Sequence, residues 1–298
     1  MNVRFGVSPI AWINDDMPEL GAGTPLEAVL RDIRELGFEG VELGGSFPRD
    51  PKALAKLLDK HGLALVGGWY SGSLLRQSAD EEWQALQSHL ALLEALGSSV
   101  FIFAETSNAI HGNRSRPLAS TPRLEASRWP EFGARLTSVA ERIRDRGLRF
   151  AYHHHLGTVV ERGEDLRDFL AHTSEAVGLT LDTGHAALAG IDPVQVIREH
   201  PGRIAHVHCK DVRGKVFRGV ESAGSSFLDG VLAGMFTAPG DGDLDYSAVM
   251  KALAAIDYKG WIIVEAEQDP AKADPRKYQE LGLGTLRREA GAAGLVAA

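Results

Sequence analysis

Short apolar runs alternate with amphipathic runs about eight times along the 298 residues, and this alternation limits the possible fold more than any other feature. Each apolar run is nearly continuous, which is typical of a strand that a parallel sheet buries on both faces. Eight strand–helix repeats predict an α/β fold, a single (β/α)₈ barrel. The predicted strands are residues 3–8, 40–43, 63–68, 98–104, 148–155, 178–182, 203–208 and 261–265.

The segments between these strands carry helix signals. Residues 24–27 (Thr-Pro-Leu-Glu) have the pattern of a capping box with proline at the first helical position, and Gly37 would end that helix. Asp192 and Asp274 each precede a proline, as an N-cap residue does. Residues 290–298 have little pattern and are predicted to fray. A doubly wound sheet is the alternative fold, but no G-x-G-x-x-G follows the first strand.

No shift in composition marks a domain boundary, so we expect one domain over residues 1–298. Two connections are long for this fold: residues 105–127, after the fourth strand, and 212–243, after the seventh. In a barrel both would leave the carboxyl ends of strands, where active sites lie. We predict that residues 212–243 form a mobile lid, with Phe227 and Leu228 packing over the mouth or against a neighbouring subunit.

Composition excludes several classes of protein. The formal net charge is −8, and the chain has no basic stripe, which disfavours a nucleic-acid partner. No run approaches 18 apolar residues, so we expect no membrane span. The single cysteine, Cys209, fits a reducing compartment, and the first residues do not resemble a secretory leader; both indicate the cytoplasm. The sequence leaves open whether the chain forms a homo-oligomer.

Four late strands end in residues that bind metals. We expect the ends of the fifth to eighth strands to be neighbours on one rim, where His153, Asp182, His208 and Glu265 converge on one divalent cation. Any one of these endings could be a polar surface turn or a solvated charge; the combination of four in this order favours a metal site. A mixed imidazole and carboxylate set suits Mn²⁺, Co²⁺, Fe²⁺ or Zn²⁺.

Further polar residues lie beside these strand ends and would face the same mouth. An exposed tryptophan and an amide after the first strand suit a polyol ring, and a lysine follows the His-x-His of the seventh strand. Each could instead be structural: a turn cap, a pair at the rim or a surface ion pair. The predicted substrate-binding residues are Trp12, Asn14, Glu42, His155, His206 and Asp211. The unranked candidates for proton transfer are His185, Lys210 and Glu267.

Two sets of motifs resemble known families. The motifs Asp-Thr-Gly-His, His-x-His and Val-Glu, at residues 182–185, 206–208 and 264–265, resemble the xylose-isomerase-like barrels, which include sugar epimerases, isomerases and endonucleases. Longer runs spread from end to end resemble the inosose dehydratases. These runs are residues 8–16, 18–21, 152–155, 226–229, 239–242 and 265–270.

The resemblance to the inosose dehydratases implies a function. It implies a hydro-lyase of myo-inositol catabolism that dehydrates a cyclic polyol ketone, scyllo-inosose (2-keto-myo-inositol), to a trihydroxycyclohexane-1,2-dione. It also implies a requirement for Co²⁺ or Mn²⁺ and a role for glutathione. One position departs from the wider family, whose fifth strand supplies a glutamate ligand, because that position holds His153 here. The fourth ligand is therefore His153, His155 or water.

Three other functions compete with this one. A ketose or inosose epimerase on the same barrel would begin with the same proton removal, and only its product would differ. An endonuclease is disfavoured by the acidic balance of the chain. A non-catalytic polyol-binding protein would need neither a metal nor an acid–base pair, so a metal assay separates it from the enzymes.

Overall fold

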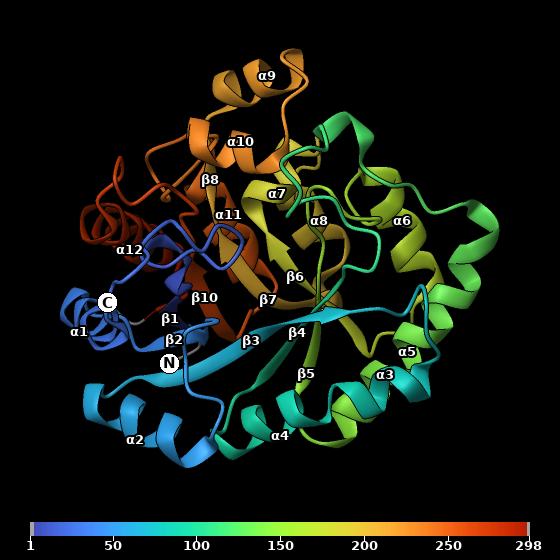
Figure 1. Ribbon diagram of the computed structural model, residues 1–298, viewed down its shortest axis with the longest axis horizontal. Helices are drawn as coiled ribbons and strands as arrows, with labels where there is room; N and C mark the ends of the chain where they lie inside the picture. Colours follow the sequence, from blue (N-terminus) through green and yellow to red (C-terminus); the bar gives the residue numbers. More distant parts are fainter. Residues whose placement is uncertain (1–2, 297–298) are drawn as a thin grey trace.

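Eight parallel strands close into a barrel in the computed structural model, which describes residues 3–296 (Figure 1). They are β1 (Val3–Val7), β2 (Gly40–Leu43), β3 (Ala64–Gly72), β4 (Val100–Glu105), β5 (Arg149–His153), β6 (Val177–Asp182), β7 (Ile204–Cys209) and β10 (Gly260–Val264). The order around the barrel is β1-β10-β7-β6-β5-β4-β3-β2. The predicted barrel is confirmed, and β5, β6, β7 and β10 are consecutive neighbours in it.

Helices surround the strands (Figure 1). They are α1 (Leu26–Leu36), α2 (Pro51–His61), α3 (Ala79–Ala85), α4 (Gln87–Ala95), α5 (Trp129–Asp145), α6 (Gly163–His172), α7 (Thr183–Leu188), α8 (Pro193–Glu199), α9 (Gly214–Ser222), α10 (Phe227–Ala233), α11 (Tyr246–Ala255) and α12 (Pro275–Ala292). Among residues 3–296, no helix combines the length and apolar character needed to cross a membrane.

Most of the predicted helix boundaries are confirmed. Asp192 and Asp274 cap α8 and α12 by accepting backbone N–H groups, and Gly37 ends α1 with φ 93°. The predicted capping box at residues 24–27 is wrong: extended Pro25 takes the N-cap position, so Thr24 lies one residue too early. The frayed tail is wrong up to residue 296, because α12 runs to Ala292 and Leu295 is buried; residues 297–298 lie outside the described range.

Apolar side chains fill the barrel below the carboxyl ends of its strands. Trp261 and Ile263 form a separate cluster there with Val66, Ile102 and their neighbours. Gly40 makes room for this layer, since a Cβ at that position would lie 2.7 Å from Cη2 of Trp261. Because these side chains fill the interior, the barrel opens above them, at the carboxyl ends of the strands.

The two long connections follow β4 and β7, as predicted, and they meet. The second holds α9, α10 and a two-stranded antiparallel sheet of β8 (Asp211–Val212) with β9 (Phe236–Thr237). Leu118 of the first connection joins an apolar cluster with Phe217, Phe227 and Leu228 of the second. Pro117 pairs with Ser226, and Figure 1 shows α9 and α10 together at the edge of the molecule beside the first connection.

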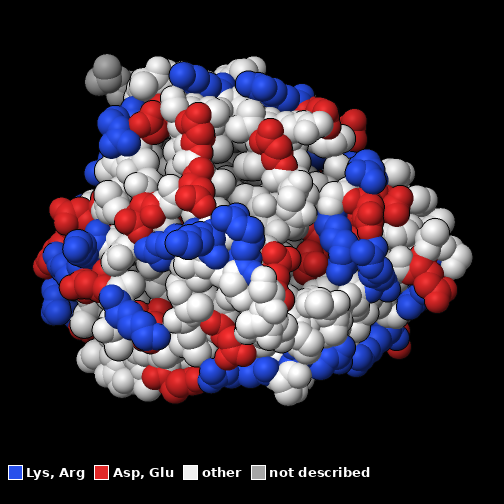
Figure 2. Space-filling view, turned by 90° about the horizontal axis from the view of Figure 1, so that it is seen from above, with Lys and Arg blue, Asp and Glu red and all other residues white. Residues whose placement is uncertain are grey.

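Charges of both signs are spread over the face seen in Figure 2, where blue and red side chains lie intermingled. Many exposed charges among the described residues are paired, as Arg276 is with Asp32 and Glu35. The predicted absence of a nucleic-acid partner remains a prediction.

Candidate active site

Four strand ends bring the predicted metal ligands together. His153 ends β5, Asp182 ends β6, His208 lies in β7 and Glu265 follows β10. The Nδ1 atom of His208 lies 3.3 Å from Nε2 of His153 and 2.8 Å from Oε2 of Glu265. The Oδ2 atom of Asp182 lies 3.7 Å from each of the two imidazole nitrogens. The donor atoms of His153, Asp182 and His208 therefore face one point, and Glu265 lies beside His208.

Asp182 divides its two oxygens between two tasks. Its Oδ1 accepts hydrogen bonds from the backbone N–H groups of Gly184 and His185 and so caps α7. Its Oδ2 is buried and has no hydrogen-bond partner. Burial raises the pKa of Asp182 to about 6, against the opposing charge of Lys210. A buried carboxylate oxygen without a donor is costly unless something binds it.

His153 presents a lone pair to the same point. Its Nδ1 lies 2.9 Å from the carbonyl oxygen of His154, which can only accept a hydrogen bond, so Nδ1 carries the proton and Nε2 is free. Burial holds the pKa of His153 well below its usual value, which keeps the ring neutral. Neutral imidazole is the form that binds metals. His155, the alternative ligand, turns its Nδ1 to the carbonyl of Leu156 and packs against His185 with ring centroids 3.8 Å apart.

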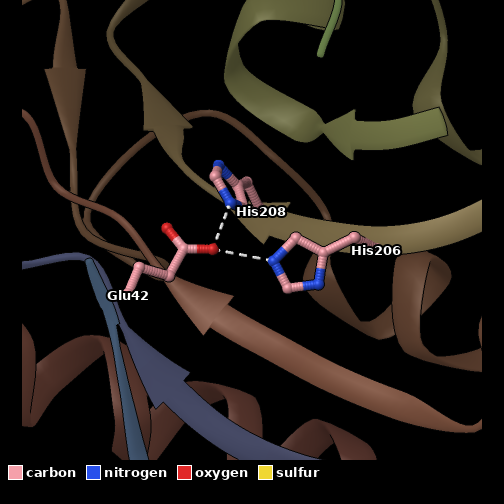
Figure 3. Close-up of side chains that lie close together, drawn as sticks. All are labelled: Glu42, His206 and His208. Carbon is pink, nitrogen blue, oxygen red and sulfur yellow. Dashed lines mark hydrogen bonds and ion pairs between the residues drawn. The ribbon is translucent and has the colours of Figure 1, made fainter. Parts of the chain in front are cut away.

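His208 is held from its other side by Glu42 of β2, a strand separated from β7 by β10 and β1. Oε1 of Glu42 accepts hydrogen bonds from Nε2 of His206 at 2.8 Å and Nε2 of His208 at 2.9 Å (Figure 3). Burial raises the pKa of Glu42, but the two histidines outweigh it and lower the pKa to about 2. Burial lowers the pKa of His208, but Glu42 and Glu265 raise it well above its usual value.

Lys210 lies behind the donors as a buried cation. Its Nζ lies 2.6 Å from Oε1 of Glu265 and 3.3 Å from Oε2 of Glu267. Burial lowers the pKa of Lys210, but these carboxylates and Asp182 outweigh it, so the pKa is raised. The Nε2 atom of His185 lies 3.1 Å from Nζ. Burial raises the pKa of Glu267 to about 7, and its Oε1 has no hydrogen-bond partner.

A pocket of about 340 Å³ opens beside these groups at the carboxyl end of the barrel. Of the predicted site residues, it is lined by Glu42, His153, His155, His208, Glu265 and Glu267. Asp182, His185, His206 and Lys210 are buried behind this lining. Its size is within the usual range of small-molecule sites.

Three predicted substrate-binding residues lie elsewhere. Trp12 was expected to be exposed but is 4% exposed, in the main core, with Nε1 bonded to Asp32. The side-chain oxygen of Asn14 accepts the backbone N–H groups of residues 16 and 17 and so shapes its own turn. Asp211 accepts four backbone N–H groups, from residues 212, 240, 242 and 244, and so fixes the end of the second long connection.

Other lining residues were missed by sequence reasoning. Trp69 lies edge-on to His153 with ring centroids 5.2 Å apart, and β3 continues past residue 68, where the predicted strand stops. His111 comes from the first long connection, and its ring lies 4.8 Å from that of His155. Asp16 and Arg49 also line the pocket. The only sequence signal for Trp69 was an aromatic residue directly after an apolar run.

The donor set fits a divalent cation. Atoms about 2.1 Å from one ion lie roughly 3.0–3.4 Å apart at right or tetrahedral angles, and the separations among the donor atoms of His153, Asp182 and His208 are 3.3–3.7 Å. Glu265 lies 2.8 Å from His208. The unpartnered Oδ2 of Asp182 supplies the independent sign that something belongs there.

Comparisons with known proteins agree with the barrel. The family described as "Xylose isomerase-like TIM barrel" matches residues 30–288. The rhizopine catabolism protein MocC of Rhizobium meliloti is 45% identical over 99% of this chain and 90% of its own length. The inosose dehydratases of Clostridium tetani and Geobacillus thermodenitrificans are 37% and 38% identical over 93% of this chain and 93% of their own lengths.

Two solved structures share the fold. L-ribulose 3-epimerase has a TM-score of 0.69 at 19% identity, covering 99% of this chain and 98% of that chain. The 3-keto-D-glucoside 4-epimerase YcjR of E. coli has a TM-score of 0.68 at 16% identity, covering 96% and 99%. The dehydratase relatives make the chain an enzyme of the hydro-lyase class. The chain belongs to the xylose isomerase-like TIM barrel family, and the inosose dehydratases and MocC are its relatives within that family.

Proposed function

We propose that the chain dehydrates scyllo-inosose, a cyclic polyol ketone, to a trihydroxycyclohexane-1,2-dione, and that it needs a divalent cation, Mn²⁺ or Co²⁺. His153, Asp182, His208 and Glu265 would hold the ion. The observation that carries the proposal is the unpartnered Oδ2 of Asp182 among three further donors at the wall of the pocket. The inosose dehydratases, which are 37% and 38% identical over 93% of this chain, support this choice of substrate.

The reaction needs no oxidant or reductant. A proton leaves the carbon beside the ketone, the bond to the hydroxyl on the next carbon breaks, and that hydroxyl departs with a proton as water. The enol that remains becomes the dione by tautomerisation. A divalent ion at the four donors would supply Lewis-acid polarisation of the carbonyl.

Glu267 is our candidate for moving the proton. It lines the pocket with a free Oε1, whereas His185 and Lys210, the other two candidates, lie behind the lining. Lys210 holds Oε2 of Glu267 and Oε1 of Glu265, so it fixes the direction of both carboxylates. A proton shuttle must reach the substrate directly or through one water, and of the three candidates only Glu267 lines the pocket.

His155, Trp69 and Asp16 are the proposed substrate contacts. Nδ1 of His155 donates to the carbonyl of Leu156, so Nε2 is free to accept a hydroxyl hydrogen bond. Trp69 supplies an apolar wall beside His153 and His155. Asp16 adds a carboxylate at the same pocket.

The test is the product formed from scyllo-inosose by the metal-loaded protein. The proposal predicts one water lost per turnover and a dione, seen by mass spectrometry and ultraviolet absorption. An isomeric inosose of unchanged mass, with no dione, would reject dehydration in favour of the epimerase alternative. Parallel assays with and without glutathione test the requirement that the family resemblance implies. Homo-oligomer formation and cytoplasmic location also remain predictions.

A further inference from the structure

His208 belongs to two groups of side chains that could each hold a cation, and it joins them through different ring atoms. Its Nε2 faces Glu42 and His206 (Figure 3). Its Nδ1 faces His153 and Asp182, with Glu265 2.8 Å away. All three members of the first group are buried. Which group takes the ion decides what Glu42 and His206 do.

The first group is already satisfied by hydrogen bonds. Oε1 of Glu42 lies 2.8 and 2.9 Å from the two Nε2 atoms, and each imidazole can donate an N–H to it. Among the described residues, neither Glu42 nor His206 has a buried side-chain atom without a hydrogen-bond partner, whereas Asp182 has one. An ion bound between Glu42 and His206 would remove two good hydrogen bonds and leave Oδ2 of Asp182 unpaired.

We propose that Glu42 is a positioning residue that orients His208 for the cation, and that His206 in turn fixes Glu42. This inference rests on the metal site of the proposed function. With one proton held on Nε2 by Glu42, His208 would give up the proton of Nδ1 when the ion binds and present the lone pair of that atom to the ion, beside the other donors. The negative charge of Glu42 also makes the ring a stronger ligand. Glu42 does this from β2, which β10 and β1 separate from β7.

A positioning role for Glu42 differs from direct contact with the substrate, which is the role expected from the sequence. Glu42 does line the pocket, but Oε1 is occupied by the two histidines. A substrate contact would change KM and leave the affinity for the ion unchanged. A positioning residue changes the affinity for the ion in the absence of any substrate.

The experiment is a calorimetric titration of the metal-stripped protein with Mn²⁺, without substrate. The variants are Glu42→Gln, Glu42→Asp, His206→Asn and Asp182→Asn. Glu105→Gln is the matched control, because Glu105 is also a fully buried carboxylate at a strand end, but its oxygens bond Leu75 and Ser107. Circular dichroism checks the fold of each variant, and the visible absorption of bound Co²⁺ reports the ligand geometry.

We expect Glu42→Gln to keep one site and to raise the Kd for the ion by about 10- to 100-fold. Glu42→Asp has a shorter side chain that no longer reaches His208, so it should also raise the Kd for the ion. This variant replaces Glu42→Gln in the test if Glu42→Gln does not fold. Asp182→Asn should lose binding, and Glu105→Gln should bind as the wild type does. The Co²⁺ spectrum should shift in the Glu42 variants and, through Glu42, in His206→Asn, but not in Glu105→Gln.

Three results would overturn the inference. An unchanged Kd in both Glu42 variants with a raised KM would make Glu42 a substrate contact. Loss of binding in His206→Asn with retention in Asp182→Asn would put the ion between Glu42 and His206. Wild-type protein that binds no ion would remove the metal from both proposals. Wild-type protein that binds an ion but does not dehydrate scyllo-inosose would overturn the proposed function alone.

Discussion

At Asp182, helix capping and the proposed metal binding involve different atoms of one carboxylate. Oδ1 takes two backbone N–H groups at the start of α7, and Oδ2 points to the donors of the other three strands. A substitution that keeps an oxygen at the position of Oδ1 but removes the carboxylate charge therefore preserves helix capping while it weakens metal binding. Asparagine caps helices about as well as aspartate does.

We expect Asp182→Asn to keep the fold and lose the activity. The rate should fall on the order of 10³-fold or more, because the variant removes an anionic ligand. Thermal unfolding should change little. Asp192→Asn is the control, since Asp192 caps α8 with one oxygen and has no part in the pocket. Steady-state rates and metal content are measured for both. Wild-type activity and metal content in Asp182→Asn would contradict the assignment.

Glu267→Gln tests proton transfer without removing a ligand. The amide keeps the shape of the side chain but cannot carry the proton, so kcat should fall by about 10²- to 10⁴-fold. The affinity for the ion should be nearly unchanged. Gln268→Ala is the control. Gln268 is the next residue along the chain and its side chain donates a hydrogen bond to Thr237, so kcat should stay near the wild-type value. A wild-type kcat in Glu267→Gln would transfer the role to another group at the pocket.

The positions of the candidate site residues on strands were predictable, and several on connections were not. That His153, Asp182, His208 and Glu265 lie at neighbouring strand ends could be predicted because the strand order fixes which ends are neighbours; their role as ligands stays a prediction. Trp12 and Asn14 were misplaced because the turn after β1 is held by its own hydrogen bonds and by core packing, which periodicity does not report. His111 was missed for the same reason: tertiary contacts position its connection.

At the scale of elements, the strands were predicted well and their exact ends less well. The run of residues 40–43 matches β2, whereas β3 continues to Gly72, four residues past the predicted end. The extension carries Trp69 and Tyr70, which pack on neighbouring aromatic rings and so stay in register with β4. Packing of this kind lengthens a strand without leaving a pattern in the sequence.

Substitution of Gly40 tests how tightly the barrel interior is packed. A methyl group there would lie 2.7 Å from the ring of Trp261, so Gly40→Ala should destabilise the fold by about 1–3 kcal/mol. Gly202→Ala is the control, because a Cβ at that position meets nothing within 4 Å. Urea unfolding compares the two. Equal stability of both variants would show that the layer under the pocket is loosely packed.

The second long connection is folded, and its mobility remains a prediction. Phe227 of α10 lies with its ring 5.1 Å from that of His155 and 5.9 Å from that of His185, so it covers two residues of the site. The apolar cluster it shares with Leu118 ties the two connections together. A lid would have to move as this folded unit.

Hydrogen exchange tests the lid. With a non-reacting substrate analogue bound, residues 212–243 should gain protection because closure would order the unit. Helix α5, on the outside of the barrel, is the internal control and should exchange at the same rate with and without the analogue. Unchanged protection across all of residues 212–243 would reject the lid.

At the scale of the whole molecule, the alternation of apolar and amphipathic runs was sufficient to predict a barrel with its site at the carboxyl ends of the strands. An apolar layer fills the interior, so the open end carries the pocket and the four donors. The sequence could not separate ligands from the residues that orient them. That distinction depends on which atom of His208 faces which carboxylate.

Metal removal tests the central claim most directly. The protein is stripped with EDTA, assayed with scyllo-inosose, and assayed again after Mn²⁺ or Co²⁺ is restored, with metal content measured at each step. We predict that dione formation disappears with the ion and returns with it, because the buried Oδ2 of Asp182 faces His153 and His208 and has no hydrogen-bond partner. Full dehydratase activity in protein shown to be free of metal would contradict the account.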